Sequence, residues 1–144
     1  MTLVRRHFLQ LVGAVTTPAG ADITFAQAPQ AAAKLTQILR ADLQRQDQRV
    51  QETTVNILDM PPSAAAPWHM HPGAQEILFV IDGNIAVEIE GQGMTTLRPG
   101  EIVLIPAEIP HLARNGGSSA AKALVTHSRA DKDKPFVVAV KRST

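Results

Sequence analysis

Three histidines and one glutamate stand at spacings that could place four metal ligands in one pocket: His69, His71, Glu76 and His111. Successive side chains on a β-strand point to opposite faces, so the first two histidines share a face. Pro72 and Gly73 then break the strand. The apolar run that begins at the glutamate can bring its carboxylate back beside the two imidazoles. Imidazole and carboxylate groups in this arrangement predict a pocket for a divalent metal ion, which His111 would complete from a distant strand.

Short β-like runs separated by turn signals fill the chain from residue 53 onward. We expect strands at residues 53–60, 65–71, 76–81, 85–90, 94–97, 102–106, 112–115, 122–127 and 136–141. Asp82-Gly83 between two apolar runs predicts a tight hairpin turn, because such turns need positive φ angles. Many short strands at even spacing favour a β-barrel or β-sandwich.

Side-chain alternation also predicts which residues face outward. In the run 76–81, Leu78 and Val80 follow Glu76 inward, whereas Phe79 and Ile81 take the outer parity and are apolar as well. An outer apolar surface can pack against another sheet or against a second copy of the chain, and we expect a homodimer.

The two metal-ligand segments resemble the paired motifs of the cupin superfamily. The first reads H-x-H, four residues, E, six residues, G, and ends at Gly83. The second runs from Gly100 to Asn115 and reads G, five residues, P, four residues, H, three residues, N. The spacing around the first motif is similar to that of germins. The resemblance implies an all-β double-stranded β-helix, or jelly-roll barrel, with a metal held by His69, His71, Glu76 and His111.

Two residues depart from the motif pattern. Ser63 and Glu108 stand where the motifs usually have glycine. Glycine is used where the backbone needs a positive φ angle, so the replacements predict loops of locally different shape.

Other polar residues are weaker candidates. Gln75 is an uncharged amide and its parity points outward, so it is a poorer ligand than Glu76. Asn115 precedes two glycines, which favours a turn-forming role. His7 and His127 are interpreted as surface groups. The chain has no tyrosine, which argues against cupin epimerases and lyases that use tyrosine as an acid or base.

Composition limits the class of protein. A chain of 144 residues with 44% apolar and 19% charged residues can form one globular domain. The formal net charge is +1 and the basic residues are dispersed, so nucleic acid is not an expected partner. The sequence holds no cysteine, which excludes disulfides and thiolate ligands.

The N-terminus resembles a twin-arginine export signal. Arg5 and Arg6 precede a short apolar run that ends near Val15. This run is too short for a stable membrane span, which needs about 20 apolar residues. We therefore expect an export signal at 1–28, a linker and first strand region at 29–50, a barrel at 51–144, and a periplasmic or secreted protein.

The predicted donor set indicates the chemistry. Three neutral imidazoles, one carboxylate and a dication carry a net charge of +1 and leave open coordination positions, which suits small oxygen-bearing anions. The preferred hypothesis is a metal-dependent oxidoreductase or dioxygenase, and the alternative is a non-catalytic cupin that binds metal or a small ligand. Manganese or iron is favoured if the protein folds before export, while nickel, zinc or copper remain possible.

Overall fold

The structure of the protein is a computed structural model that describes residues 23–24, 32–42 and 49–142. The described residues form eleven β-strands and no helix: β1 (Ile23–Thr24), β2 (Lys34–Asp42), β3 (Glu52–Met60), β4 (Ala65–Met70), β5 (Ala74–Asp82), β6 (Ile85–Ile89), β7 (Gly93–Leu97), β8 (Ile102–Ile105), β9 (His111–Arg114), β10 (Ala121–Arg129) and β11 (Val138–Ala139). The strands expected from residue 53 onward are all present, although β11 is shorter than the run 136–141.

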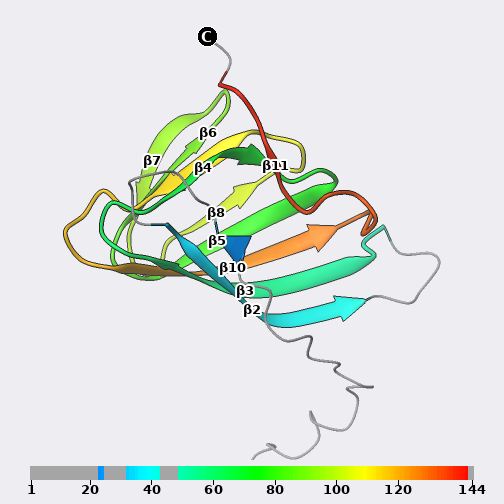
Figure 1. Cartoon of the computed structure of the whole chain (residues 1–144), viewed down its shortest axis with the longest axis horizontal. Coiled ribbons are helices and arrows are strands. Elements are labelled where there is room, and N and C mark those ends of the chain that lie inside the picture. The colour runs from blue at the N-terminus through cyan, green and yellow to red at the C-terminus, as the bar shows by residue number, and fades with distance from the viewer. Residues whose placement is uncertain (1–22, 25–31, 43–48, 143–144) are drawn as a thin grey trace, which may run out of the picture.

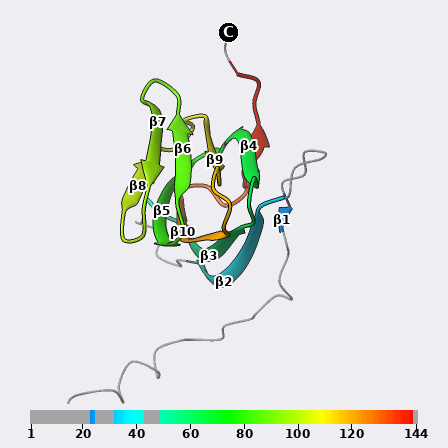
Figure 2. The same ribbon diagram turned by 90° about the vertical axis from the view of Figure 1, so that its left-hand side faces the viewer.

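The strands form two facing antiparallel sheets. The six-stranded sheet has the order β1-β2-β3-β10-β5-β8, and the five-stranded sheet has the order β11-β4-β9-β6-β7 (Figure 1). In Figure 2 the strands β2, β3, β10 and β5 lie below β4, β9 and β6, with the barrel interior between the two layers. The predicted all-β double-stranded β-helix is confirmed.

The core lies between the sheets and follows the alternation of the strands. On β3 every second residue from Glu52 to Met60 is buried, and β10 shows the same alternation from Ala121 to Arg129. The central part is apolar, with Leu58, Leu78, Val87 and Ile105 all buried. One end of the interior is polar, so the barrel is divided along its length into an apolar part and a part that carries titratable side chains.

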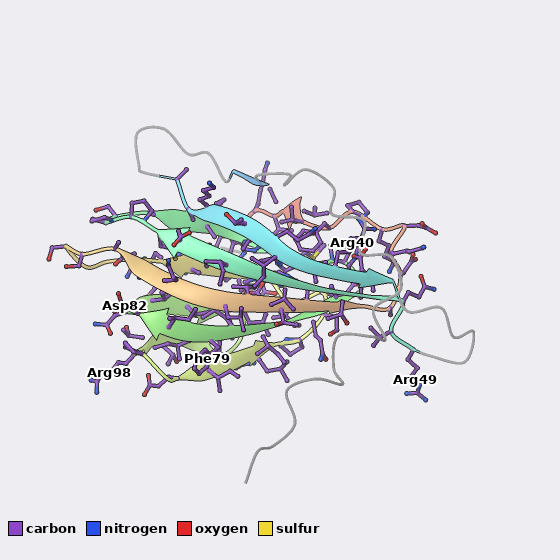
Figure 3. The ribbon with its side chains drawn as sticks, turned by 90° about the horizontal axis from the view of Figure 1, so that it is seen from below. Arg40, Arg49, Phe79, Asp82 and Arg98 are labelled. Atoms are coloured by element: carbon purple, nitrogen blue, oxygen red, sulfur yellow. The ribbon has the colours of Figure 1, made fainter. Side chains whose placement is uncertain are left out.

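The outer parity of β5 is confirmed. Leu78 and Val80 are buried, whereas Phe79 and Ile81 are 37% and 44% exposed. Phe79 is paired with Ile102 of the edge strand β8, which is 61% exposed. Figure 3 views the molecule from the side of this sheet and shows Phe79 on β5. The described residues therefore leave an apolar surface uncovered along β5 and β8.

The expectation that Ser63 and Glu108 reshape their loops is wrong. Both residues adopt the left-handed conformation that a glycine would take, with φ angles of 64° and 66°. The turn at Glu108 is held by contacts with the first motif, because the Gly73 N–H donates to Glu108 Oε1 at 3.1 Å and the Glu108 N–H donates to the His71 carbonyl at 3.3 Å. Tertiary contacts at this turn thus support a backbone conformation that the residue itself disfavours.

Part of the N-terminal expectation lies outside the described residues. Positions 1–22, which include Arg5 and Arg6, are not described. β1 falls within the expected signal 1–28 and pairs with β2, where Ile23 is opposite Leu35. In the described part of the chain, no helix has the length and hydropathy needed to cross a membrane.

Candidate metal centre

The four predicted ligands meet inside the barrel. One donor atom from each of His69, His71, Glu76 and His111 lies within 4.8 Å of the other three, and all four residues are buried. Opposite donors on an ion with bonds of about 2.1 Å are separated by roughly 4.2 Å, so a modest contraction would suffice to bind one ion. Away from these four residues and the adjacent His127, the described residues contain no further group of three or more histidine, cysteine, aspartate or glutamate donors at such spacing.

Three strands from two sheets bring the donors together. β4 carries His69, and His71 follows at its end. His69 is opposite His111 in the pairing of β4 with β9, so the five-stranded sheet supplies two neighbouring imidazoles. Glu76 comes from β5 in the facing sheet, after the turn at Gly73, whose φ angle is 70°. The Pro-Gly turn therefore carries the chain from one sheet to the other within the first motif.

The Nδ1 atom of each of the three histidines faces a backbone carbonyl. The His69 Nδ1 lies 2.5 Å from the Pro67 oxygen, the His71 Nδ1 lies 2.7 Å from the Phe136 oxygen, and the His111 Nδ1 lies 3.0 Å from the Ile109 oxygen. A carbonyl can only accept, so the proton of each neutral ring resides on Nδ1 and the lone pair on Nε2. Metal-binding histidines characteristically use the second nitrogen in this way.

The surroundings of the donors fit a divalent cation. The Nε2 atom of His111 is buried and makes no hydrogen bond among the described residues, although it lies 3.4 Å from Glu76 Oε2. His71 Nε2 lies 3.0 Å from the same oxygen. A buried carboxylate surrounded by imidazole lone pairs is costly without a cation. The donor set therefore matches the imidazole and carboxylate ligands of divalent transition metals.

Burial and neighbouring charges set the protonation of the candidate donors. Burial, assisted by the nearby His111, lowers the pKa of His69 from 6.5 to about 4. Burial raises the pKa of Glu76, but contacts with His111, His127 and His71 outweigh this effect and hold it well below its usual value. Burial lowers the pKa of His111, yet the Glu76 carboxylate outweighs burial and raises it above 6.5. At neutral pH the carboxylate is therefore ionised and His69 is neutral, while a cation must compete with a proton on His111.

His127 is the site residue that sequence analysis missed. It was interpreted as a surface group, but only 1% of it is exposed and its Nε2 lies 3.1 Å from Glu76 Oε2. The alternation along β10 could have revealed it, because Ala121, Ala123, Val125 and His127 share one parity and are all buried. Burial at this end of the strand is nevertheless difficult to judge from one sequence, because the same face also carries Arg129, a residue type that is usually exposed.

Phe136 packs against the histidines from the segment before β11. Its ring lies 5.2 Å from the ring of His71 and 4.6 Å from that of His127. The cavity at the four donors measures about 30 Å³, which is space for one or two water molecules. The centre therefore offers room only for a small ligand unless the surrounding residues move.

The two weaker candidates behave as expected. Gln75 is exposed and points away from the donors. Asn115 is buried and forms a turn, because its side-chain amide donates to the carbonyls of Met60 and Ser119 while its oxygen accepts from the Gly117 N–H. Neither residue contributes a donor atom to the centre.

A two-sheet β-barrel that encloses three imidazoles and one carboxylate defines a candidate metal-binding jelly-roll protein. The chain matches the cupin domain family over residues 56–127, which is half of its length, and it belongs to that family.

The chain is similar to three further proteins in sequence or in structure. Germin-like protein 1 of Brassica napus is 40% identical over 77 residues, which cover 51% of this chain and 37% of that protein. A recombinant oxalate oxidase in complex with glycolate matches with a TM-score of 0.54 at 29% identity, covering 60% of this chain and 45% of that one. An uncharacterized conserved protein with a double-stranded β-helix domain from Klebsiella pneumoniae has a TM-score of 0.61 at 16% identity over 88% of this chain and 90% of its own, which shows the fold alone. The match to the germin-like relative spans little more than a third of its length.

Proposed function

We propose that this protein is a metal-dependent oxidoreductase or dioxygenase that acts on a small oxygen-bearing anion. The observation that carries the proposal is the convergence of His69, His71, Glu76 and His111 on one point within a buried cavity. When bound there, a divalent transition metal would supply Lewis acidity and open coordination positions for anionic oxygen ligands. The four buried side chains would hold the ion.

Two further observations support a small anionic ligand. The cavity of about 30 Å³ admits only a few atoms beside the ion. The similar oxalate oxidase was solved in complex with glycolate, a small hydroxy acid. We extend this ligand class, rather than the particular molecule, to the present chain.

The direct test is oxygen consumption by protein loaded with Mn²⁺ or Fe²⁺, with a panel of small carboxylates and catechols that includes glycolate and oxalate. We expect turnover with at least one small carboxylate and none with His111→Ala at the same metal concentration. Tight ligand binding by calorimetry without oxygen consumption or product would contradict the oxidoreductase.

A non-catalytic cupin that binds metal or a small ligand is the second candidate. The small volume of the cavity favours it, because an enzyme must find room for both substrate and product beside the ion. Calorimetry in the same experiment distinguishes the enzyme from the binding protein, since a binding protein would bind its ligand and leave it chemically unchanged.

Manganese or iron in an exported protein is a further part of the proposal. The support is Arg5-Arg6 before a short apolar run, together with a route that moves proteins already folded. Elemental analysis of protein purified from the periplasm of its native cell should find manganese or iron, and copper or zinc would contradict this. Arg5→Lys with Arg6→Lys should retain the protein in the cytoplasm, whereas normal export would refute the signal.

The N-terminal sequence of the exported protein would locate the cleavage site. A cut after Ala21 keeps β1, whereas a cut near Ala28 removes it together with its pairing to β2. The expected signal 1–28 corresponds to the later cut, and the pairing of Ile23 and Thr24 with β2 is the observation that favours the earlier one.

A homodimer also belongs to the proposal. Phe79, Ile102 and Leu104 are exposed on neighbouring strands, and β8 is the edge of its sheet. A second copy would cover these side chains. Light scattering should give twice the mass of one chain for the natural sequence and the mass of one chain for Phe79→Asp. A natural chain that is monomeric at all concentrations would refute the dimer.

A further inference from the structure

His127 lies directly against the proposed ligand Glu76 without belonging to the four-donor set. The two residues are opposite each other in the pairing of β10 with β5. The Nε2 atom of His127 lies 3.1 Å from Glu76 Oε2 and 3.3 Å from His71 Nε2. At these distances His127 is either a fifth ligand or a hydrogen-bond donor to the carboxylate. A ligand needs a bare lone pair on Nε2, whereas a donor needs a proton on that atom.

The second nitrogen of the ring distinguishes these roles. His69, His71 and His111 each place Nδ1 against a backbone carbonyl, which fixes the proton there and frees Nε2 for a metal. The Nδ1 atom of His127 is also buried, but it has no hydrogen-bond partner among the described residues. His127 therefore lacks the feature that prepares the other three rings as ligands.

Placing the proton of a neutral His127 ring on Nδ1 is unfavourable on two counts. It would bury a donor without an acceptor, and it would direct the Nε2 lone pair at a carboxylate oxygen. Placing the proton on Nε2 instead forms a charge-assisted hydrogen bond to Glu76 Oε2 and leaves only a bare lone pair at Nδ1. The neighbouring rings of His71 and Phe136, at 4.4 Å and 4.6 Å, hold the imidazole in place for this contact.

We propose that His127 is a positioning residue that donates its Nε2 proton to Glu76 Oε2 and fixes the orientation of that carboxylate toward the three ligand imidazoles. The proposal rests on the metal site put forward under Proposed function and makes it a four-donor centre with a fourth imidazole that donates a hydrogen bond. Its consequence is a carboxylate already ordered before the metal arrives, so less conformational freedom is lost on binding.

Nitrogen NMR of the natural chain tests the assignment without any substitution. Long-range proton–nitrogen correlations in protein loaded with ¹¹³Cd²⁺ should show three imidazoles with protonated Nδ1 and ¹¹³Cd coupling at Nε2. His127 should instead show a protonated Nε2 and no coupling. Coupling to His127, or a proton on its Nδ1, would overturn the proposal.

Two substitutions measure the consequence. His127→Phe keeps a ring of similar size without a donor, and it should weaken Cd²⁺ binding in chelator competition by about 10- to 100-fold with one ion still bound per chain. His127→Gln supplies an amide donor and should recover part of that loss. Equal affinity in His127→Phe and the natural chain would overturn the proposal, and if His127→Phe does not fold, the NMR assignment decides.

The design separates this inference from the metal site itself. A natural chain that binds no Cd²⁺ would contradict the proposed function. The spectrum of the metal-free protein would then still decide the His127 hydrogen bond, because the Nε2 proton is expected there as well.

Discussion

Two buried glutamates on the inner face of the six-stranded sheet have opposite surroundings. Glu52 on β3 is opposite Arg129 of β10, and Glu76 on β5 is opposite His127 of the same strand. Both carboxylates are almost wholly buried. β10 thus supplies a basic residue to a glutamate on each of its two neighbouring strands. Arg129 carries a permanent charge, whereas the charge of His127 depends on its protonation.

The cluster around Glu52 is neutralised by fixed charges. Arg129 Nη1 lies 2.9 Å from Glu52 Oε1, and Arg40 Nη2 lies 2.6 Å from Glu52 Oε2. Figure 3 shows Arg40 near the end of β2. Arg129 also donates to the carbonyls of Lys132 and Lys134, which ties the segment after β10 to the barrel. The Glu52 carboxylate is therefore paired with fixed positive charges on neighbouring strands, which indicates a role in the fold.

The cluster around Glu76 lacks such fixed charges. Its neighbours are imidazoles, and three of them hold their Nδ1 protons toward carbonyls. The function of a buried carboxylate is therefore indicated by the residues that contact it. Permanent guanidinium charges indicate a structural role, whereas convergent imidazole lone pairs indicate a site for a cation.

The largest effect is expected when the charge balance around Glu52 is broken. Arg129→Ala leaves a buried carboxylate with one fewer guanidinium and should lower the free energy of unfolding by about 3–5 kcal/mol in urea denaturation. Combining it with Glu52→Leu should restore much of this loss. A change below about 1 kcal/mol in the single variant would contradict the structural role.

The second effect concerns the metal. His111→Ala should weaken Mn²⁺ binding by more than about 100-fold, equivalent to more than ~2.7 kcal/mol, because one of four donors is lost. Equilibrium dialysis measures it, and circular dichroism should show that the metal-free fold survives. Arg129→Ala, studied under conditions where it is folded, is the matched control and should keep its metal. Full retention of metal by His111→Ala would remove His111 from the centre.

The pH dependence of the metal-free protein gives a smaller effect. The pKa of His69 is about 4 in the fold against 6.5 when unfolded, so the unfolded chain binds more protons between these values. Stability should therefore fall as the pH drops from 6.5, by roughly 2 kcal/mol at pH 5. His111 has a pKa above 6.5 in the fold, and it adds no comparable slope at lower pH.

Urea denaturation across this pH range checks the prediction. His69→Gln should reduce the slope without abolishing it, because burial also lowers the pKa of His127. A stability that is flat between pH 6.5 and 5 in the natural chain would contradict the buried, neutral state of His69.

The smallest effect lies outside both clusters. Ser63 has a φ angle of 64°, so Ser63→Gly should relieve backbone strain worth about 0.5–1 kcal/mol. The added flexibility of the unfolded chain offsets part of this gain, and a small net stabilisation is expected. Thermal unfolding measures this, with unchanged metal affinity as the control. A destabilised variant would show that side-chain contacts of Ser63 outweigh the strain.

Alternation and turn signals predicted most of the barrel from the sequence. The parities of Leu78, Phe79 and Val80 were right because a strand has a period of two and one face meets a core. The four donors were predicted because motif spacing fixes where each strand starts after its turn. Gly73, for example, turns the chain between the sheets with a positive φ angle.

The remaining features depend on contacts between distant segments. The burial of His127 arises because β10 lies between β3 and β5 and because Phe136 packs against its ring. The left-handed backbone at Glu108 depends on its hydrogen bonds with Gly73 and His71. The alternation along β10 gives the face of His127, but its contacts with Glu76 and Phe136 and the turn at Glu108 are not encoded in the spacing of neighbouring residues.

Crystals soaked with Mn²⁺ and measured near the manganese absorption edge test the central claim most directly. The account predicts one anomalous peak per chain, about 2.0–2.3 Å from Nε2 of His69, His71 and His111 and from a carboxylate oxygen of Glu76, with no peak beside Glu52. A peak elsewhere, or no peak at the four donors at saturating Mn²⁺, would contradict it.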